Sequence, residues 1–340
     1  MRHTYVIITL CLLIAIALPC GLLVGGVALP ASDVVGIITG SYSGEYADVG
    51  SFIVLETRLP ALLTSLLAGA ALAVAGLLMQ TTFDNPLAGP SIMGISGGAS
   101  LGVALVLMAF GGAVGVWGRI GVAAGAMAGA MAVLGILLLF SMVVRSSDVL
   151  LIVGILLGYA TSSVISLLNF FSTEQSVHSF VMWGLGSFAG VSLDTLAIFS
   201  TLCLLLILAA WPYAKSLNAL LFGEQFARNA SINTGRVRTA LLFLSGGLTA
   251  VVTAWCGPIG FIGLIAPHVA RMLLASSNHR ILIPATALCG GAIGLICQII
   301  SVAPMLSSGG AIPINAITPI VGVPIIIYVL LNRRKLLYFN

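Results

Sequence analysis

The feature that most constrains this chain is a series of ten apolar runs, each about as long as a bilayer-crossing helix. Such a helix needs about 20 apolar residues, because the hydrocarbon core is about 30 Å thick. Of the 340 residues, 60% are hydrophobic and only 6% charged, and no soluble fold could keep that much apolar surface from water. We therefore predict an all-α integral membrane protein. The predicted spans are approximately Tyr5–Leu29, Ala61–Thr81, Ile92–Phe110, Arg119–Val143, Val149–Phe171, Leu193–Trp211, Val237–Trp255, Ile259–Ala275, Ile281–Ala303 and Ile314–Leu331.

The distribution of positive charge predicts the orientation of these spans. With a cytoplasmic N-terminus, ten crossings place eleven of the thirteen Lys and Arg residues on the cytoplasmic side, and only Arg58 and Arg119 outside. Cytoplasmic loops carry such an excess, and an odd number of crossings would put the Arg333–Lys335 cluster on the wrong side. We predict that both termini are cytoplasmic. The longest loops are too short for a second domain, so residues 1–340 form one transmembrane domain.

The cytoplasmic segment at about 215–236 reads as a short amphipathic helix. Glu224 and Arg228 stand at i and i+4, where opposite charges attract, and Gly223 and Gly235 would let the chain turn. The segment either docks into a groove on a partner protein or lies in the lipid interface, and the residues alone leave both open. The apolar residues at helical spacing are Leu217, Leu220, Leu221, Phe222 and Phe226.

The cytoplasmic turn at 83–90 is the second polar feature. It contains Asn85 between apolar spans, and Pro86 and Pro90 end helices and make a turn rigid. It is either a constriction at the inner mouth of a pathway or an ordinary tight loop. His268, near the inner end of its span, is either part of a proton relay or a structural polar residue. The second interpretation is favoured because His268 has no acidic neighbour in the sequence.

The chain shows no energy source of its own. Neither of its two lysines belongs to a P-loop motif, and the span interiors carry essentially no ionisable groups, which argues against an ion-coupled secondary transporter. The six cysteines are scattered, so no metal centre is predicted. An intramembrane enzyme would need converging acid, base or metal-ligand residues, and these are missing from the pattern. A partner that hydrolyses ATP is the favoured source of energy.

Several motifs resemble one transporter family. They are Arg58-Leu59-Pro60, Asn85-Pro86-Leu87-Ala88, Trp183-Gly184-Leu185-Gly186-Ser187 and the run from Gly257-Pro258 to Pro267-His268. From about Arg58 to Lys335 the chain resembles the FecCD family of ABC importer permeases, which take up iron–siderophore chelates, haem and cobalamin. The resemblance implies a type II importer fold and a homodimer with a central pathway that works by alternating access.

The resemblance also implies partners and a location. We expect two ATP-binding subunits that carry ATP and Mg, a periplasmic binding protein, and the bacterial inner membrane around the permease. No cofactor, metal or nucleic acid is expected on this chain, and no catalysis by it. Iron chelate is the expected substrate, with cobalamin or haem as alternatives.

Finally, the resemblance assigns roles to individual residues. Arg58 matches a basic residue that docks against the binding protein, and the inner gate falls on Asn85, Pro86 and Leu87, with Ser147 in a second gate. The residues assigned to coupling with the ATP-binding subunit are Leu217, Leu221, Gly223, Glu224, Ala227, Arg228 and Gly235.

Overall fold

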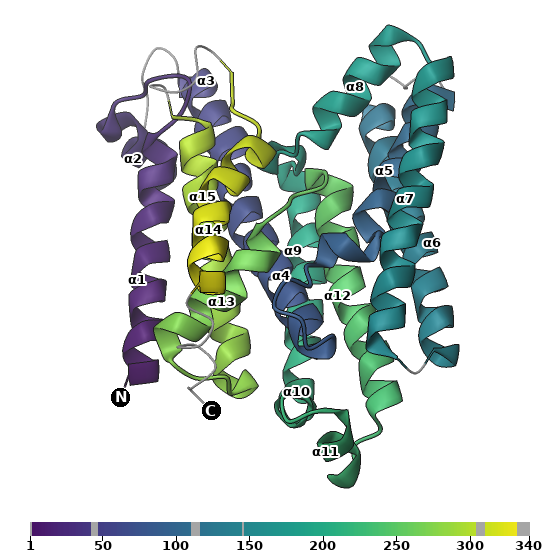
Figure 1. Ribbon diagram of the computed structural model, residues 1–340. Coiled ribbons are helices and arrows are strands. Elements are labelled where there is room, and N and C mark those ends of the chain that lie inside the picture. The colour runs from purple at the N-terminus through teal and green to yellow at the C-terminus, as the bar shows by residue number, and fades with distance from the viewer. Residues whose placement is uncertain (1, 42–46, 110–115, 145, 304–309, 332–340) are drawn as a thin grey trace.

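The computed structural model describes residues 2–41, 47–109, 116–144, 146–303 and 310–331, and these contain helices and no β-strand (Figure 1). The α-helices are α1 Arg2–Leu23, α2 Ala31–Thr39, α3 Ala47–Ser51, α4 Leu59–Thr82, α5 Ile95–Ala104, α6 Val116–Val143, α7 Ser147–Phe171, α8 Glu174–Gly184, α9 Leu193–Ala210, α10 Ala214–Leu220, α11 Glu224–Asn229, α12 Thr234–Cys256, α13 Ile262–Leu274, α14 His279–Ser301 and α15 Ile314–Leu331. The π-helical turns are η1 Phe52–Arg58 and η3 Leu105–Ala109, and the 3₁₀ turns are η2 Pro90–Met93, η4 Phe188–Gly190 and η5 Trp211–Tyr213.

A helix occupies each of the ten predicted spans. Within the described residues, seven helices are long and apolar enough to cross a membrane, and the other three spans hold shorter apolar helices, in α5, α13 and α15. The third span, predicted from about Ile92, begins with α5 at Ile95, because Gly94 has a φ of +73° and separates η2 from α5. A left-handed residue breaks the helical path, and glycine adopts that conformation without steric cost.

Three helices form the centre of the bundle. α4 is continuous with α3 and η1, so one helical stretch runs from Asp48 to Thr82 over 35 residues and extends for roughly 50 Å. In the most apolar 18-residue part of this stretch 78% of the residues are buried, and the same parts of α12 and α14 are also mostly buried. The corresponding share is 17% for α1, α7 and α9, which therefore lie at the periphery.

Glycine allows the central helices to approach one another at backbone distance. A Cβ placed on Gly76 of α4 would lie 1.7 Å from the carbonyl oxygen of Gly263 in α13. A Cβ on Gly102 of α5 would lie 1.9 Å from the carbonyl oxygen of Gly125 in α6. Lipid supplies no hydrophobic drive for helices to associate, so such close packing is a principal source of their attraction.

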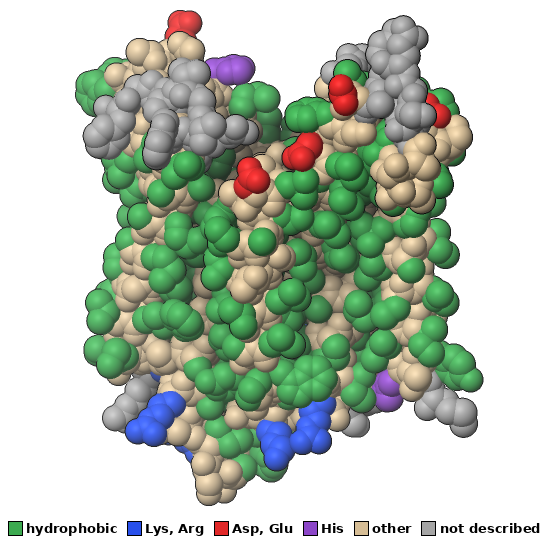
Figure 2. Space-filling model, turned by 180° about the vertical axis from the view of Figure 1, so that it is seen from behind, with side chains coloured by type: hydrophobic (Ala, Val, Ile, Leu, Met, Phe, Trp, Pro, Cys, Tyr) green, Lys and Arg blue, Asp and Glu red, His purple; other side chains and the backbone are tan. Residues whose placement is uncertain are grey.

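The two ends of the bundle differ in structure and charge. α2, α3 and α8 lie at one end, within loops 30–56 and 172–192, while α10 and α11 project from the other end (Figure 1). On the face shown in Figure 2, acidic side chains gather at the α8 end and basic side chains at the α10–α11 end. Of the residues used to predict orientation, Arg145 and Arg333–Lys335 lie outside the described residues, as does the side chain of Arg119.

Candidate functional site

The projecting element consists of two short helices, α10 and α11. The prediction of one amphipathic helix over 215–236 is wrong, but the predicted turn at Gly223 is confirmed, because this residue separates α10 from α11 with a φ of +97°. No atom lies within 4 Å of a Cβ built on Gly223, so it is the backbone conformation that favours glycine there.

Gly235 does not turn the chain as predicted. It lies in the first turn of α12, whose N-cap is Asn233, with the Asn233 side chain accepting a hydrogen bond from the N–H of Arg236 at 3.0 Å. The chain turns instead at Ser231, which has a φ of +59°. The Asn233 cap is a recognisable helix-start signal, and it places the boundary ahead of Gly235.

The apolar residues of α10 and α11 divide into buried and exposed sets. Leu217 and Ala227 are completely buried, and Leu221 is half-buried. Phe222 and Phe226 are 65% and 51% exposed, and their ring centroids lie 5.1 Å apart. We call these two residues the aromatic pair. The pair is exposed, while Leu217 packs into the main core cluster and Ala227 is buried.

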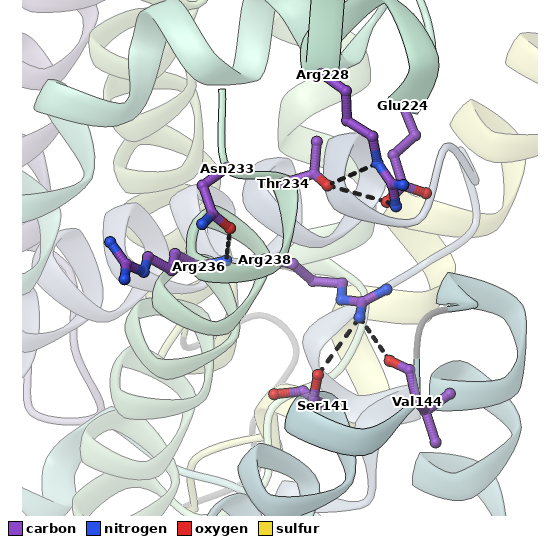
Figure 3. Close-up of polar contacts among 8 residues, drawn as sticks. All are labelled: Ser141, Val144, Glu224, Arg228, Asn233, Thr234, Arg236 and Arg238. Atoms are coloured by element: carbon purple, nitrogen blue, oxygen red, sulfur yellow. Dashed lines mark hydrogen bonds and ion pairs between the residues drawn. The ribbon is translucent and has the colours of Figure 1, made fainter. Parts of the chain in front are cut away.

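An ion pair within α11 is linked to the start of α12 by hydrogen bonds to Thr234 (Figure 3). The Arg228 guanidinium donates to Oε1 of Glu224 at 2.7 Å, which confirms the predicted i, i+4 pair. Thr234 Oγ1 also donates to this Glu224 oxygen at 3.0 Å, and Arg228 Nε donates to Thr234 Oγ1 at 3.4 Å. The hydrogen bond from Arg228 holds the pKa of Glu224 below its usual value, so this carboxyl is ionised at neutral pH. The exposed pair adds little stability, and the hydrogen bonds to Thr234 connect α11 to the start of α12.

Arg238, one turn further along α12, connects the same element to α6. Its guanidinium donates to the carbonyl oxygens of Val144 at 2.6 Å and Ser141 at 3.4 Å (Figure 3). The Ser141 carbonyl lies in the last turn of α6 and the Val144 carbonyl just beyond its end, where no intrahelical N–H remains to bond them. Arg238 was predicted only as a charge that orients the protein, and sequence offers no signal for this contact 94 residues away.

The 83–90 turn is a Schellman cap with aspartate in the position that usually holds glycine. Asp84 has a φ of +45°, the Asn85 N–H donates to the Gln80 carbonyl at 3.1 Å, and the Asp84 N–H donates to the Thr81 carbonyl at 3.4 Å. This pattern closes the end of α4. The side chain of Asn85 accepts from the Leu87 N–H at 2.9 Å, which makes a second local turn.

A hydrogen bond attaches this turn to α13. Nε2 of His268 lies 2.9 Å from the carbonyl oxygen of Pro86, to which it donates, and His268 is buried. His268 therefore has a structural partner, as favoured from the sequence. The structure brings Asn85, Pro86 and Leu87 together in one turn, with Leu87 exposed. Ser147 begins α7, and its side chain lies outside the described residues.

A groove lies beside this turn, between the start of α5 and the middle of α7. It was not anticipated from the sequence, because it forms where two helices far apart in the chain meet. Its lining residues are Ser91, Ile92, Gly94, Gly97, Ile155, Gly158, Tyr159 and Ser162.

Arg58 lies near the opposite end of α4. Its guanidinium donates to the carbonyl oxygen of Leu22 at 2.7 Å and also to that of Val27. These carbonyls lie at and just beyond the end of α1, so Arg58 caps that helix in this structure. Docking of a binding protein by Arg58 stays a prediction.

The bundle and its projecting element define a multi-pass membrane permease. The model of the FecCD transport family matches residues 10–332. The chain belongs to this family and is a permease of the type II ABC importers.

Characterised relatives match most of the chain. The vitamin B12 import system permease protein BtuC of Escherichia coli O9:H4 (strain HS) is 35% identical over 288 residues, which cover 84% of this chain and 86% of that protein. BtuC of Klebsiella pneumoniae subsp. pneumoniae is 35% identical over 287 residues, covering 84% of each chain. A solved structure described as an inward-facing conformation of a metal-chelate type ABC transporter aligns with a TM-score of 0.82 at 30% identity, over 98% of this chain and 99% of that one.

Proposed function

We propose that two copies of this chain form the membrane pathway of an importer for an iron chelate of the siderophore type. ATP and Mg bind to separate subunits that dock on α10 and α11, and a periplasmic binding protein delivers the chelate at the other end. Both chain termini face the cytoplasm, in keeping with the basic residues at the α10–α11 end. The permease itself catalyses no reaction.

The aromatic pair is the observation that carries this proposal. Two exposed phenylalanines on a polar, charged element are costly to leave in water, and aromatic residues are enriched among the anchors of protein interfaces. An element that only rested on lipid would not need the bonds that hold α11 to α12 and α12 to α6. These bonds suit a part that receives force from a partner.

The substrate class rests on the relatives. The similar solved structure is named as a metal-chelate transporter, which supports an iron chelate. The BtuC relatives are named as vitamin B12 permeases, so cobalamin is the second candidate, and haem is the third. Membership of an ABC importer family favours ATP over an ion gradient as the energy source.

Co-purification with the candidate ATP-binding subunit tests the docking step. Replacing Phe222 and Phe226 with alanine should weaken recruitment of this subunit about tenfold or more, as expected when an interface anchor is lost. The matched control is Phe170→Ala with Phe171→Ala, since this exposed pair also has ring centroids 5.1 Å apart but belongs to α7 near α8. Equal recruitment by both double variants would contradict docking through the aromatic pair.

Uptake into vesicles tests the transport step and the substrate. The full complex should import a ferric siderophore only when ATP is present on the side of α10 and α11, and an ion gradient alone should have no effect. Cobalamin imported in preference to the ferric chelate would replace the first substrate candidate by the second. Uptake driven by an ion gradient without ATP would refute the proposal.

A further inference from the structure

A chain of hydrogen bonds runs from α10 into the core of the bundle and becomes more buried along the way, from an exposed bond at Asn278 to a buried one at Thr81. Asn218 of α10 donates through Nδ2 to Oδ1 of Asn278 at 3.0 Å. Its own Oδ1 is therefore the acceptor for the backbone N–H and the Nδ1–H of His279, both at 2.8 Å. One side chain of the projecting element thus holds the first residue of α14 by two bonds.

His279 carries the chain onward to α4. It is completely buried, and because Nδ1 donates to Asn218, Nε2 is the acceptor in a neutral ring. The hydroxyl of Thr81 donates to this nitrogen at 2.9 Å. Both ring nitrogens are used, so a displacement of Asn218 would leave a buried polar group without its partner unless Thr81 moved as well.

Thr81 is itself part of the cap that forms the 83–90 turn. Its carbonyl accepts from the Asp84 N–H, and the carbonyl of the preceding residue, Gln80, accepts from the Asn85 N–H. Gln80 also bonds to α13, through Nε2 to the Leu264 carbonyl at 3.1 Å and through Oε1 from Arg271 at 2.8 Å. The turn is thereby held between the end of α4 and α13.

We propose that Asn218, His279 and Thr81 form a relay that transmits movement of α10 and α11 to the 83–90 turn. This inference rests on the proposed function, because it requires an ATP-binding subunit that moves α11. The three residues are positioning residues, and none needs to touch the substrate. Buried hydrogen bonds have discrete partners, so the relay suits a two-state rearrangement rather than a gradual deformation.

The test measures substrate imported per ATP hydrolysed by the full complex in lipid vesicles. Asn218→Leu and Thr81→Val remove hydrogen-bonding groups with little change of shape. We expect both variants to retain the ATP-binding subunit. The amount of substrate imported per ATP should fall by about fivefold or more, the size of effect that coupling between two sites typically has. Thr249→Val is the control, because Thr249 is also buried and its hydroxyl donates to the carbonyl oxygen of Ser245 in its own helix, at 2.8 Å. It should keep the wild-type ratio.

The double variant separates a relay from two independent defects. Residues of one relay should give a ratio close to that of either single variant, whereas independent effects would multiply. Three results would overturn the relay while the proposed function stood. They are an unchanged ratio in both single variants, multiplied effects in the double variant, and loss of the ATP-binding subunit from Asn218→Leu. Failure of the wild-type chain to recruit the ATP-binding subunit would instead overturn the proposed function and the relay with it.

Discussion

The contact between Gly76 and Gly263 gives the sharpest test of how the bundle is packed. Gly76 lies inside α4, where alanine would normally be the better helix former. Here an added Cβ would lie only 1.7 Å from the Gly263 carbonyl oxygen of α13. We predict that Gly76→Ala destabilises the protein despite the gain in helix propensity.

The magnitude follows from the contact distance. Carbon–oxygen contacts require about 3.3 Å, so α4 and α13 must separate locally by roughly 1.6 Å. Overpacking of this kind costs about 1–3 kcal/mol. The separation also stretches the 3.1 Å hydrogen bond from Gln80 to the Leu264 carbonyl, which is worth about 1 kcal/mol. Alanine returns about 1 kcal/mol of helix propensity, so the net loss in the free energy of unfolding is about 1–3 kcal/mol.

The measurement is unfolding in mixed micelles with increasing SDS, followed by the fluorescence of the four tryptophans. Gly135→Ala is the matched control, because Gly135 lies inside α6 and no atom lies within 4 Å of a Cβ built on it. The control should be unchanged or more stable by up to about 1 kcal/mol. If Gly76→Ala unfolded at the same SDS fraction as Gly135→Ala, backbone contact between α4 and α13 would be refuted.

Two further predictions concern the ends of the bundle. The pKa of Glu224 is lowered in the folded protein, so its contribution is present above its ordinary pKa of 4.5 and is lost as the pH falls below that value. The backbone amides of α11 should therefore be equally protected against hydrogen exchange from pH 8 to pH 5. A loss of this protection between pH 7 and pH 6 would contradict the prediction. At the other end, Asn315 donates to the carbonyls of Gly184 at 3.2 Å and Pro258 at 2.5 Å and accepts from the Gly260 N–H at 3.1 Å. Asn315→Asp cannot donate, so it should destabilise the protein by about 2 kcal/mol, as much as Asn315→Ala, and a wild-type unfolding midpoint for Asn315→Asp would be the contrary result.

The spans could be predicted because their signal is local. Length and hydropathy alone place a helix at 237–255, and α12 runs from Thr234 to Cys256. The same holds for α14, predicted at 281–303 and observed from His279 to Ser301. Both helices start a few residues earlier than predicted, because N-cap residues set their starts. Asn233 and Asn278 each accept a hydrogen bond from the N–H of a residue in the first turn.

The contacts between elements could not be predicted, because their partners are far apart in the sequence. His279 lies 61 residues from Asn218 and 198 from Thr81, and nothing in the neighbouring residues marks the three as a set. Family resemblance predicted roles for the 83–90 turn and the segment at 215–236, but it offered no signal for the hydrogen bonds among Asn218, His279 and Thr81 that lie between them. The break at Gly223 could be predicted only in part from the sequence. Glycine marks a possible turn, yet Gly235 carries the same mark and is helical.

The two kinds of contact imply different mechanical roles within one bundle. α4 meets α13 and α14 through glycines, where backbone touches backbone and no side chain can change rotamer to absorb a shift. Close-packed interiors of this kind pass strain on rather than dissipate it. Toward the α10–α11 end, side-chain hydrogen bonds also join the elements, between Thr81 and His279, from Arg271 to Gln80 and from His268 to Pro86, and each of these bonds can be kept or lost. If an ATP-binding subunit pushes α11, as proposed, the close-packed core leaves two expected responses: α4, α13 and α14 move as one body, or a specific hydrogen bond beside the 83–90 turn breaks.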